Sequence, residues 1–156
     1  MSELTIWENA NESALIEHIL ARYHQVHRLQ LQDILPLAEK VSTVHAEVFP
    51  AELLPLLQQT QQELLNHMQK EELVLFPMIL NGAGKQASMP IRMMRHEHDD
   101  HQHTVNRLIQ LTNHFTPPEN ACQSWQRLYA AIAELCQDLN NHIVLENDIL
   151  FPRVLS

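Results

Sequence analysis

The sequence contains the same motif twice. Residues 66–80 (NHMQKEELVLFPMIL) and residues 141–155 (NHIVLENDILFPRVL) both read Asn-His-x-x-x-Glu, and both continue to Leu-Phe-Pro between aliphatic residues. Residues four apart lie on the same face of a helix, so each copy places an imidazole beside a carboxylate. Two such pairs inside apolar stripes are what a binuclear metal site in a helical bundle needs.

The rest of the chain predicts an all-α fold. Only two glycines are present, and Leu, Gln, Glu, Ala and His dominate, which favours helix over strand. We expect helices over about 12–47, 51–80, 89–115 and 119–151, with turns at Val48-Phe49-Pro50, Asn81-Gly82-Ala83-Gly84-Lys85 and Thr116-Pro117-Pro118. Short connections make sequential helices antiparallel, so residues 1–156 are expected to form one up-down-up-down four-helix bundle. Pro36 is expected to kink the first helix.

Charge and cysteine content exclude several classes of function. The formal net charge is -9 and only ten Lys and Arg are scattered along the chain, which argues against binding to nucleic acid or to a membrane surface. Neither a signal peptide nor an apolar stretch long enough to span a bilayer is evident, so we expect a cytoplasmic protein. Cys122 and Cys136 fall in one predicted helix, about 21 Å apart, and are expected to stay reduced.

Both His-Glu pairs occupy core-facing positions. Steps of three and four trace these positions as Leu53, Leu57, Thr60, Leu64, His67, Glu71, Val74 and Met78 in the second helix, and as Trp125, Leu128, Ile132, Leu135, Leu139, His142, Glu146 and Ile149 in the fourth. Neither stripe contains Lys or Arg, so each buried Glu needs a metal, another cation or a proton. Two unrelated polar interruptions are the alternative, but the shared flanking residues argue against it.

Helix height identifies the partners of these pairs. In antiparallel helices, residues at equal height lie symmetrically about the connecting turn. His24 and His98 meet this condition, because the midpoints between them and the two motif pairs fall in or close to the three predicted turns. The predicted metal-binding layer therefore contains six residues, which are His24, His67, Glu71, His98, His142 and Glu146.

The remaining histidines separate by the same test. His45 lies 21 residues beyond His24, at the first turn, and is not expected in the layer. His27 and His101 each follow a predicted ligand by three residues, so each is either a fifth imidazole ligand or an outer group that contacts a ligand. We expect four others at the surface, namely His18, His96, His103 and His114.

The ligand types narrow the choice of metal. Imidazole and carboxylate without thiolate suit Fe, Mn or Zn. Two metals are expected because four His and two Glu exceed the needs of one tetrahedral zinc, and Glu71 and Glu146 are placed to bridge them. Di-iron bundles with Glu-x-x-His motifs are richer in carboxylate. The histidine-rich set here favours ferrous iron with open positions for O2 or NO.

Several segments carry a resemblance to a known family. These are Tyr23-His24, His67-Met68-Gln69-Lys70-Glu71-Glu72 with Leu75-Phe76-Pro77, His96-Glu97-His98-Asp99, and His142-Ile143-Val144-Leu145-Glu146-Asn147 with Leu150-Phe151-Pro152-Arg153. Together they resemble the hemerythrin-like domain of the repair-of-iron-centres (YtfE/ScdA/DnrN) family over nearly the whole chain. The resemblance implies a non-haem di-iron centre bridged by two Glu. It also implies repair or protection of iron-sulfur proteins damaged by nitric oxide or peroxide, by iron donation or by handling of nitric oxide.

One departure and two alternatives qualify this expectation. Such proteins usually carry an N-terminal domain with adjacent cysteines, whereas this chain starts about a dozen residues before its first predicted bundle helix. A role that needs those thiols is therefore not expected. The alternatives are an oxidoreductase that acts on NO or O2 with an external electron donor, and a module that senses O2 or NO or stores iron. Oxygen-carrying hemerythrins resemble the chain less, because they have His-x-x-x-His on the third helix and Asp on the fourth.

Overall fold

The computed structural model describes residues 3–156, which fold into helices joined by turns. Four long rods form the bundle, and we number them in chain order. Their elements are α2 (Glu12–Ile19), η1 (Leu20–His24) and α3 (Gln25–Val44) in rod 1, α4 (Leu53–Lys70), η2 (Glu71–Leu75) and α5 (Phe76–Leu80) in rod 2, α6 (Ser88–Leu111) in rod 3, and α7 (Gln123–Val144), η4 (Leu145–Leu150) and α8 (Phe151–Leu155) in rod 4. A 3-10 turn, η3 (Gly84–Ala87), precedes rod 3, and a short helix, α1 (Glu3–Trp7), precedes rod 1.

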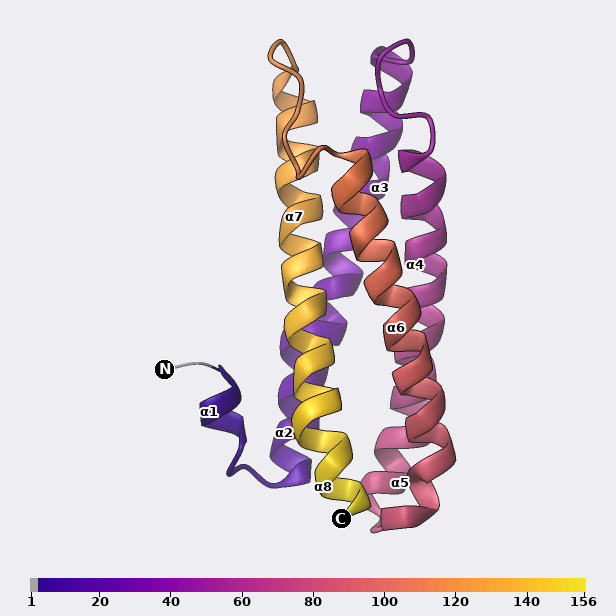
Figure 1. The fold of residues 1–156 in the computed structure, drawn as a ribbon, viewed down its shortest axis with the longest axis vertical. Helices are drawn as coiled ribbons and strands as arrows, with labels where there is room; N and C mark the ends of the chain where they lie inside the picture. Colours follow the sequence, from indigo (N-terminus) through magenta and orange to yellow (C-terminus); the bar gives the residue numbers. More distant parts are fainter. Residues whose placement is uncertain (1–2) are drawn as a thin grey trace.

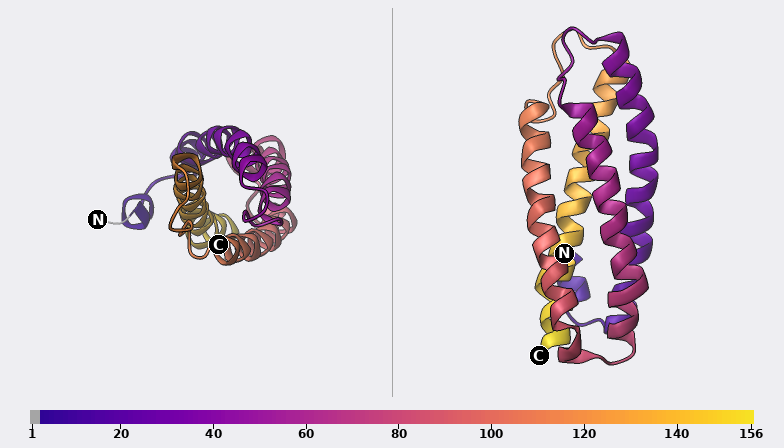
Figure 2. Two further views of the ribbon diagram at one scale, coloured as in Figure 1. Left: turned by 90° about the horizontal axis from the view of Figure 1, so that it is seen from above. Right: turned by 90° about the vertical axis from the view of Figure 1, so that its right-hand side faces the viewer.

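The rods run up, down, up and down, as predicted (Figure 1). Helix α3 packs against α4 and α7, and α6 packs against the same two helices, which closes a ring of four. Seen from one end, the ring is complete and α1 lies outside it (Figure 2). The fold is therefore an all-α antiparallel four-helix bundle.

The connection between rods 3 and 4 is longer than predicted. Helix α6 ends at Leu111, not at Phe115, because Asn113, His114 and Phe115 have φ angles of 50°, 56° and 61°. These left-handed conformations are incompatible with a right-handed helix. Rod 4 begins at Gln123 instead of 119, and the thiol of Cys122 caps its start by accepting from the backbone N–H of Trp125. Cys122 thus precedes the helix that contains Cys136, and both cysteines are free.

The other rod ends shift by up to four residues, and Pro36 does not break its helix. Rod 1 ends at Val44 instead of 47, rod 2 begins at Leu53 instead of 51, and rod 4 continues to Leu155 instead of 151. Helix α3 is continuous through Pro36. Among the described residues, we find no helix that has both the length and the apolar character needed to cross a membrane.

Three of the four rods contain a π-helical turn, which the sequence analysis did not predict. Each turn is closed by a backbone bond between residues five apart, namely Gln25 N–H to Leu20 O, Phe76 N–H to Glu71 O, and Phe151 N–H to Glu146 O. A π turn adds one residue to the helix and is frequent at functional sites. Rod 3 is α-helical throughout.

The extra residue corrects the predicted core positions. Val74 was expected to face the core of rod 2, yet it is 51% exposed, and the next residue, Leu75, is buried instead. Ile79 likewise is more buried than the predicted Met78. Rod 3 has no π turn, and the buried residues there follow steps of three and four without a shift, namely Ile91, Met94, His98, His101 and Val105.

The core is divided into two apolar clusters. The upper cluster lies between the long helices and includes Leu31, Leu64 and Leu139. The lower cluster lies between the π turns and the short terminal helices and includes Tyr23, Phe76 and Phe151. In every rod the buried His and Glu of the predicted layer lie at or next to the point where the residues of one cluster give way to those of the other. The bundle therefore contains a polar layer between two apolar blocks.

Candidate metal centre

All six residues that were predicted to form the metal-binding layer meet there. Each rod supplies one His, and rods 2 and 4 also supply one Glu each. His24 ends η1, Glu71 begins η2 and Glu146 lies in η4, so the π turns carry three of the six side chains. The relative exposure of every member is 2% or less, and the members are His24, His67, Glu71, His98, His142 and Glu146.

The six residues form two groups of four that share both carboxylates. His24 and His142 complete one group with Glu71 and Glu146, and His67 and His98 complete the other with the same two Glu. Within each group the ligand-type atoms lie within 4.8 Å of one another. The arrangement can hold two cations side by side, each next to two imidazoles and two carboxylates.

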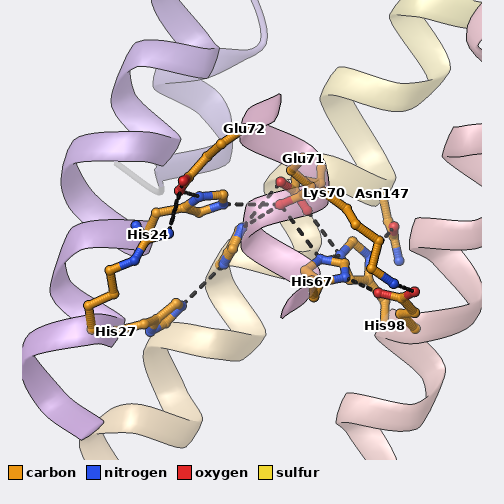
Figure 3. Close-up of polar contacts among 12 residues, drawn as sticks. His24, His27, His67, Lys70, Glu71, Glu72, His98 and Asn147 are labelled. Carbon is orange, nitrogen blue, oxygen red and sulfur yellow. Dashed lines mark hydrogen bonds and ion pairs between the residues drawn. The ribbon is translucent and has the colours of Figure 1, made fainter. Parts of the chain in front are cut away.

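The Nε2 atoms of all four imidazoles lie close to the shared carboxylates. Figure 3 shows His24 and His67 on either side of Glu71. His24 Nε2 lies 3.0 Å from Glu71 Oε1, and His67 Nε2 lies 3.6 Å from the same oxygen. Glu146 is approached by His98 Nε2 at 2.9 Å and by His142 Nε2 at 3.2 Å. Each carboxylate therefore lies between imidazoles of both groups.

The outer Nδ1 atom of each imidazole is held by a further side chain. The contacts are His24 to Glu72 Oε2 at 2.6 Å, His67 to Glu97 Oε1 at 2.8 Å, His98 to Asn147 Oδ1 at 2.8 Å, and His142 to His27 Nε2 at 3.1 Å. An acceptor at Nδ1 fixes the ring and leaves Nε2 free to bind a metal. The sequence analysis gave Glu72, Glu97 and Asn147 no role. Their signal was position, since each is the immediate neighbour of a predicted ligand.

His27 and His101 both lie in the layer but belong to neither group of four. His27 connects His142 to the surface, because its Nδ1 contacts Gln30 Oε1 at 3.2 Å and Gln30 donates to Asp138 at 2.9 Å. His101 packs edge-on against the ring of His67, with the ring centroids 4.9 Å apart. Both residues are thus outer groups in this structure.

The first motif copy has an acidic surrounding that favours a charged imidazole. Burial opposes protonation of His67, but the carboxylates of Glu71 and Glu97 raise the pKa of His67 to about 10. The hydrogen bond from His67 lowers the pKa of Glu97 to about 2, and Lys70 adds to this effect. Burial also opposes protonation of His24, yet Glu71 raises the pKa of His24 above its ordinary value.

The second copy favours neutral imidazoles. Burial and the neighbouring His24 lower the pKa of His142 well below its ordinary value. Burial and His142 likewise lower the pKa of His27 to about 3. For Glu146, burial acts to raise the pKa, but the contact with His98 outweighs it and the pKa is lowered. The layer therefore contains an ionised carboxylate that is fully buried.

The environment of the two buried carboxylates suits a bound cation. Among the described residues, Glu71 Oε2 has no hydrogen-bond partner, and Glu146 Oε1 has only its ion-pair contact with His98 Nε2, at 2.9 Å. A buried carboxylate oxygen without a partner is costly. The unpartnered oxygen belongs to Glu71, one of the two residues that both groups share, where a bridging carboxylate would use its free lone pairs. The donor set therefore fits a pair of metal ions.

The remaining histidines lie outside the layer. His45 ends rod 1 at the far end of the bundle, where its Nε2 lies 3.3 Å from Cys122 Sγ. His96, His103 and His114 are exposed, as predicted. His18 is only half-exposed, because its ring stacks on Trp7 with centroids 4.2 Å apart. This contact was not predicted, because Trp7 belongs to α1, a helix outside the four that were expected.

The bundle with its buried His and Glu layer has the architecture of a hemerythrin-like protein. Residues 15–154 match the hemerythrin HHE cation-binding domain family, and the chain belongs to that family. Family membership agrees with a centre built for metal cations.

Three relatives align with nearly the whole of this chain. The chain is 54% identical over 156 residues to "Iron-sulfur cluster repair protein DnrN" of Neisseria gonorrhoeae, which covers 100% of this chain and 99% of the relative. It is 46% identical over 152 residues to "Probable iron-sulfur cluster repair protein" of Haemophilus influenzae, covering 96% and 68%. It is also 46% identical over 151 residues to "Iron-sulfur cluster repair protein YtfE" of Dickeya chrysanthemi, again covering 96% and 68%. The last two relatives extend well beyond the aligned region.

Proposed function

We propose that the protein holds two iron ions in the polar layer and uses them in the repair of iron-sulfur clusters. One ion lies in the His24/His142 group and the other in the His67/His98 group, with Glu71 and Glu146 as bridges. The observation that carries the metal assignment is that the two groups share both carboxylates. The assignment to repair is supported by the name and the full-length match of the gonococcal relative.

The side chains of the layer favour divalent iron that is bound reversibly. Four imidazoles and two carboxylates carry little negative charge, which suits a divalent ion in preference to a trivalent one. Imidazoles bind only when their Nε2 is deprotonated, so loading displaces the proton that the acidic surrounding holds on His67. A pair of ferrous ions supplies electrons and open positions for small ligands. We place this chemistry in the cytoplasm, where free thiols such as Cys122 and Cys136 persist.

Metal analysis of protein purified without oxygen tests the centre. We expect about two irons per chain, and Mössbauer spectra of an exchange-coupled pair. One zinc per chain and no coupled iron would contradict the proposal.

Reactivation of a damaged iron-sulfur enzyme tests the role. We expect the loaded protein to restore activity to a nitric oxide-treated dehydratase, and we expect Glu71→Leu and Glu146→Leu to abolish the effect. Glu134→Leu removes an exposed carboxylate of α7 and should behave as the wild type. Equal repair by iron-free Glu146→Leu protein would refute an iron-based mechanism.

Binding of NO or O2 at the same centre is the second candidate. It is favoured by the count of protein ligands, because each group offers four and iron commonly accepts six. Repeated formation of N2O with a supplied reductant would support an oxidoreductase. Consumption of NO that stops after one equivalent per centre would count against it.

A further inference from the structure

The phenylalanines of the repeated Leu-Phe-Pro motif lie against imidazoles of the polar layer. Phe76 stacks on His24, with the ring centroids 5.7 Å apart and the planes at 29°. Phe151 stacks on His98, with the centroids 6.0 Å apart and the planes at 6°. Both phenylalanines are buried in the lower apolar cluster. Each motif copy therefore supplies a ring to the imidazole of the rod that precedes it in the chain.

The other two imidazoles of the layer also pack against a ring from a neighbouring rod. Tyr23 of rod 1 stacks on His142 of rod 4, with the centroids 5.4 Å apart and the planes at 16°. His101 of rod 3 meets His67 of rod 2 edge-on, with the centroids 4.9 Å apart and the planes at 76°. Both geometries are favourable for aromatic rings at this separation. Every rod thus supplies one ring to one neighbour, in the same direction around the bundle.

The π turns bring the stacked rings to the side of the layer that faces the lower cluster. In an α-helix the residue four positions after a Glu shares its face, whereas in a π turn the residue five positions after it does. Phe76 follows Glu71 by five residues and donates its backbone N–H to the Glu71 carbonyl, and Phe151 is related to Glu146 in the same way. Tyr23 lies within the π turn of rod 1. Rod 3 is α-helical throughout, and its ring meets the imidazole edge-on instead of stacking.

A stacked ring restrains the motion that the hydrogen bond at Nδ1 leaves free. The contact of His24 with Glu72 fixes one edge of the imidazole, but a single contact does not fix the tilt of the ring plane. The ring of Phe76, stacked on the same imidazole, fixes this tilt. His98 is held in the same two ways. A side chain that is already ordered loses little freedom when a ligand binds, and this favours binding.

We propose that Phe76, Phe151 and Tyr23 are positioning residues of the metal centre, and that the π turns of rods 1, 2 and 4 serve to deliver their rings. Each ring holds the imidazole of a neighbouring rod with its Nε2 towards the shared carboxylates. The three rings together raise the affinity of the layer for metal ions. This role rests on the proposed function, because it requires that the layer binds metal.

The metal affinity of leucine variants tests this role. The probe is Co²⁺, which is divalent and resists oxidation by air, and competition with a chelator of known affinity measures its binding. We expect Phe76→Leu and Phe151→Leu to bind Co²⁺ roughly two- to tenfold more weakly, because one freed side chain must be ordered on binding. Phe49→Leu is the matched control, since Phe49 is a buried ring that packs on Trp125 in the upper cluster, and it should bind as the wild type does. Wild-type affinity in both motif variants, or an equal loss in the control, would overturn the proposal.

A pair of Tyr23 variants separates the ring from its hydroxyl, and it keeps the test decisive where a phenylalanine variant fails to fold. Tyr23→Phe retains the ring that stacks on His142 and should bind Co²⁺ with wild-type affinity. Tyr23→Leu removes the ring and should bind roughly two- to tenfold more weakly. Equal affinities of the two variants would show that the stacked ring has no positioning role.

NMR spectra of the Co²⁺-loaded protein separate positioning from a general loss of stability. The Nδ1 protons of imidazoles bound to Co²⁺ give individually shifted signals. We expect Phe76→Leu to displace mainly the signal of His24, and Phe151→Leu mainly that of His98. Equal displacement of all the signals would contradict the proposal. If the wild type binds neither Co²⁺ nor Fe²⁺, the proposed function itself fails. If it binds two ions and the variants match it in affinity and spectrum, only the positioning role fails.

Discussion

The two motif copies place the same pair of side chains, one His and one Glu, in the layer, but their surroundings differ. In the first copy, the Nδ1 of His67 donates to the ionised carboxylate of Glu97, which also pairs with Lys70. In the second copy, the Nδ1 of His142 contacts a neutral, fully buried His27. A sequence repeat can thus specify equal metal-binding geometry while the neighbouring rods make the two halves electrostatically unequal.

We expect the largest effect from replacing a carboxylate that both groups of four share. Such a variant tests whether the two groups can bind metal independently. We expect Glu71→Gln or Glu146→Gln to lose both ions, because each carboxylate belongs to both groups of four. Elemental analysis of anaerobically purified variants measures this, with circular dichroism as the check on folding. A variant that keeps one tightly bound iron would show that the carboxylate serves only one half.

Replacing the outer partners sharpens the difference between the halves. Outer groups that hold a ligand histidine typically contribute 10- to 100-fold to metal affinity, so we expect Glu97→Gln to weaken binding by roughly that factor. His27→Gln should have a smaller effect, because an amide oxygen can still accept from His142. Competition with a chelator of known affinity measures both. Equal losses in the two variants would mean that the charge of Glu97 is unimportant.

The metal-free protein should show the inequality as a pH profile. The pKa of His67 is raised to about 10, so its stabilisation is complete below the unfolded value of 6.5 and is lost as the pH rises toward 10. The pKa of His27 is lowered to about 3, so stability falls as the pH drops below 6.5.

Urea denaturation of metal-free protein at several pH values tests this. The free energy of unfolding should be highest near neutral pH and decline on both sides. His27→Gln should flatten the acid side between about pH 5 and 6.5, above the range in which Glu97 titrates. An unchanged acid slope in this variant would rule out His27 as its cause.

The smallest effect concerns a feature that both copies share. Pro77 and Pro152 are each the second residue of a short helix that follows a π turn, where proline needs no backbone donor. Pro77→Ala and Pro152→Ala should each lower the free energy of unfolding by about 0.4–1 kcal/mol, mainly because the unfolded chain gains conformational entropy. Denaturation midpoints measure this, and a much larger loss at one site would show that its π turn depends on the proline.

The sequence predicted the bundle and the layer because both rest on simple periodicity. Apolar residues at steps of three and four predicted the core-facing sides of the helices. Symmetry about the connecting turns predicted that His24 and His98 lie at the same height as the two motifs. The wrong core positions in rod 2 have one cause. A π turn adds a residue without a clear signal in residue type, so the core position beyond Glu71 is Leu75 and not Val74. In rod 3, without such a turn, the buried residues follow steps of three and four throughout.

The outer partners were beyond the reach of the same reasoning. Whether a polar residue beside a ligand turns inward depends on which rod lies opposite, which the periodicity of one helix does not contain. Glu72 reaches His24 across rods 1 and 2, and Glu97 reaches His67 across rods 2 and 3. By contrast, the Asn that opens each motif copy is exposed in both, at positions 66 and 141. A shared residue was therefore no guide to a shared role.

We expect the polar layer also to divide the metal-free molecule into two folding units, because it separates the two apolar clusters. In the metal-free protein, the buried polar layer connects the lower apolar cluster to the upper one. The lower cluster also includes residues of the short helices α2, α5 and α8, which have few turns of their own. Such a block opens at a lower free energy than the rest of a domain, and amide hydrogen exchange would report it as a separate cooperative unit. Bound cations would link the two units, because their ligands come from all four rods. Release of the cations would then be coupled to local opening of the lower end of the bundle.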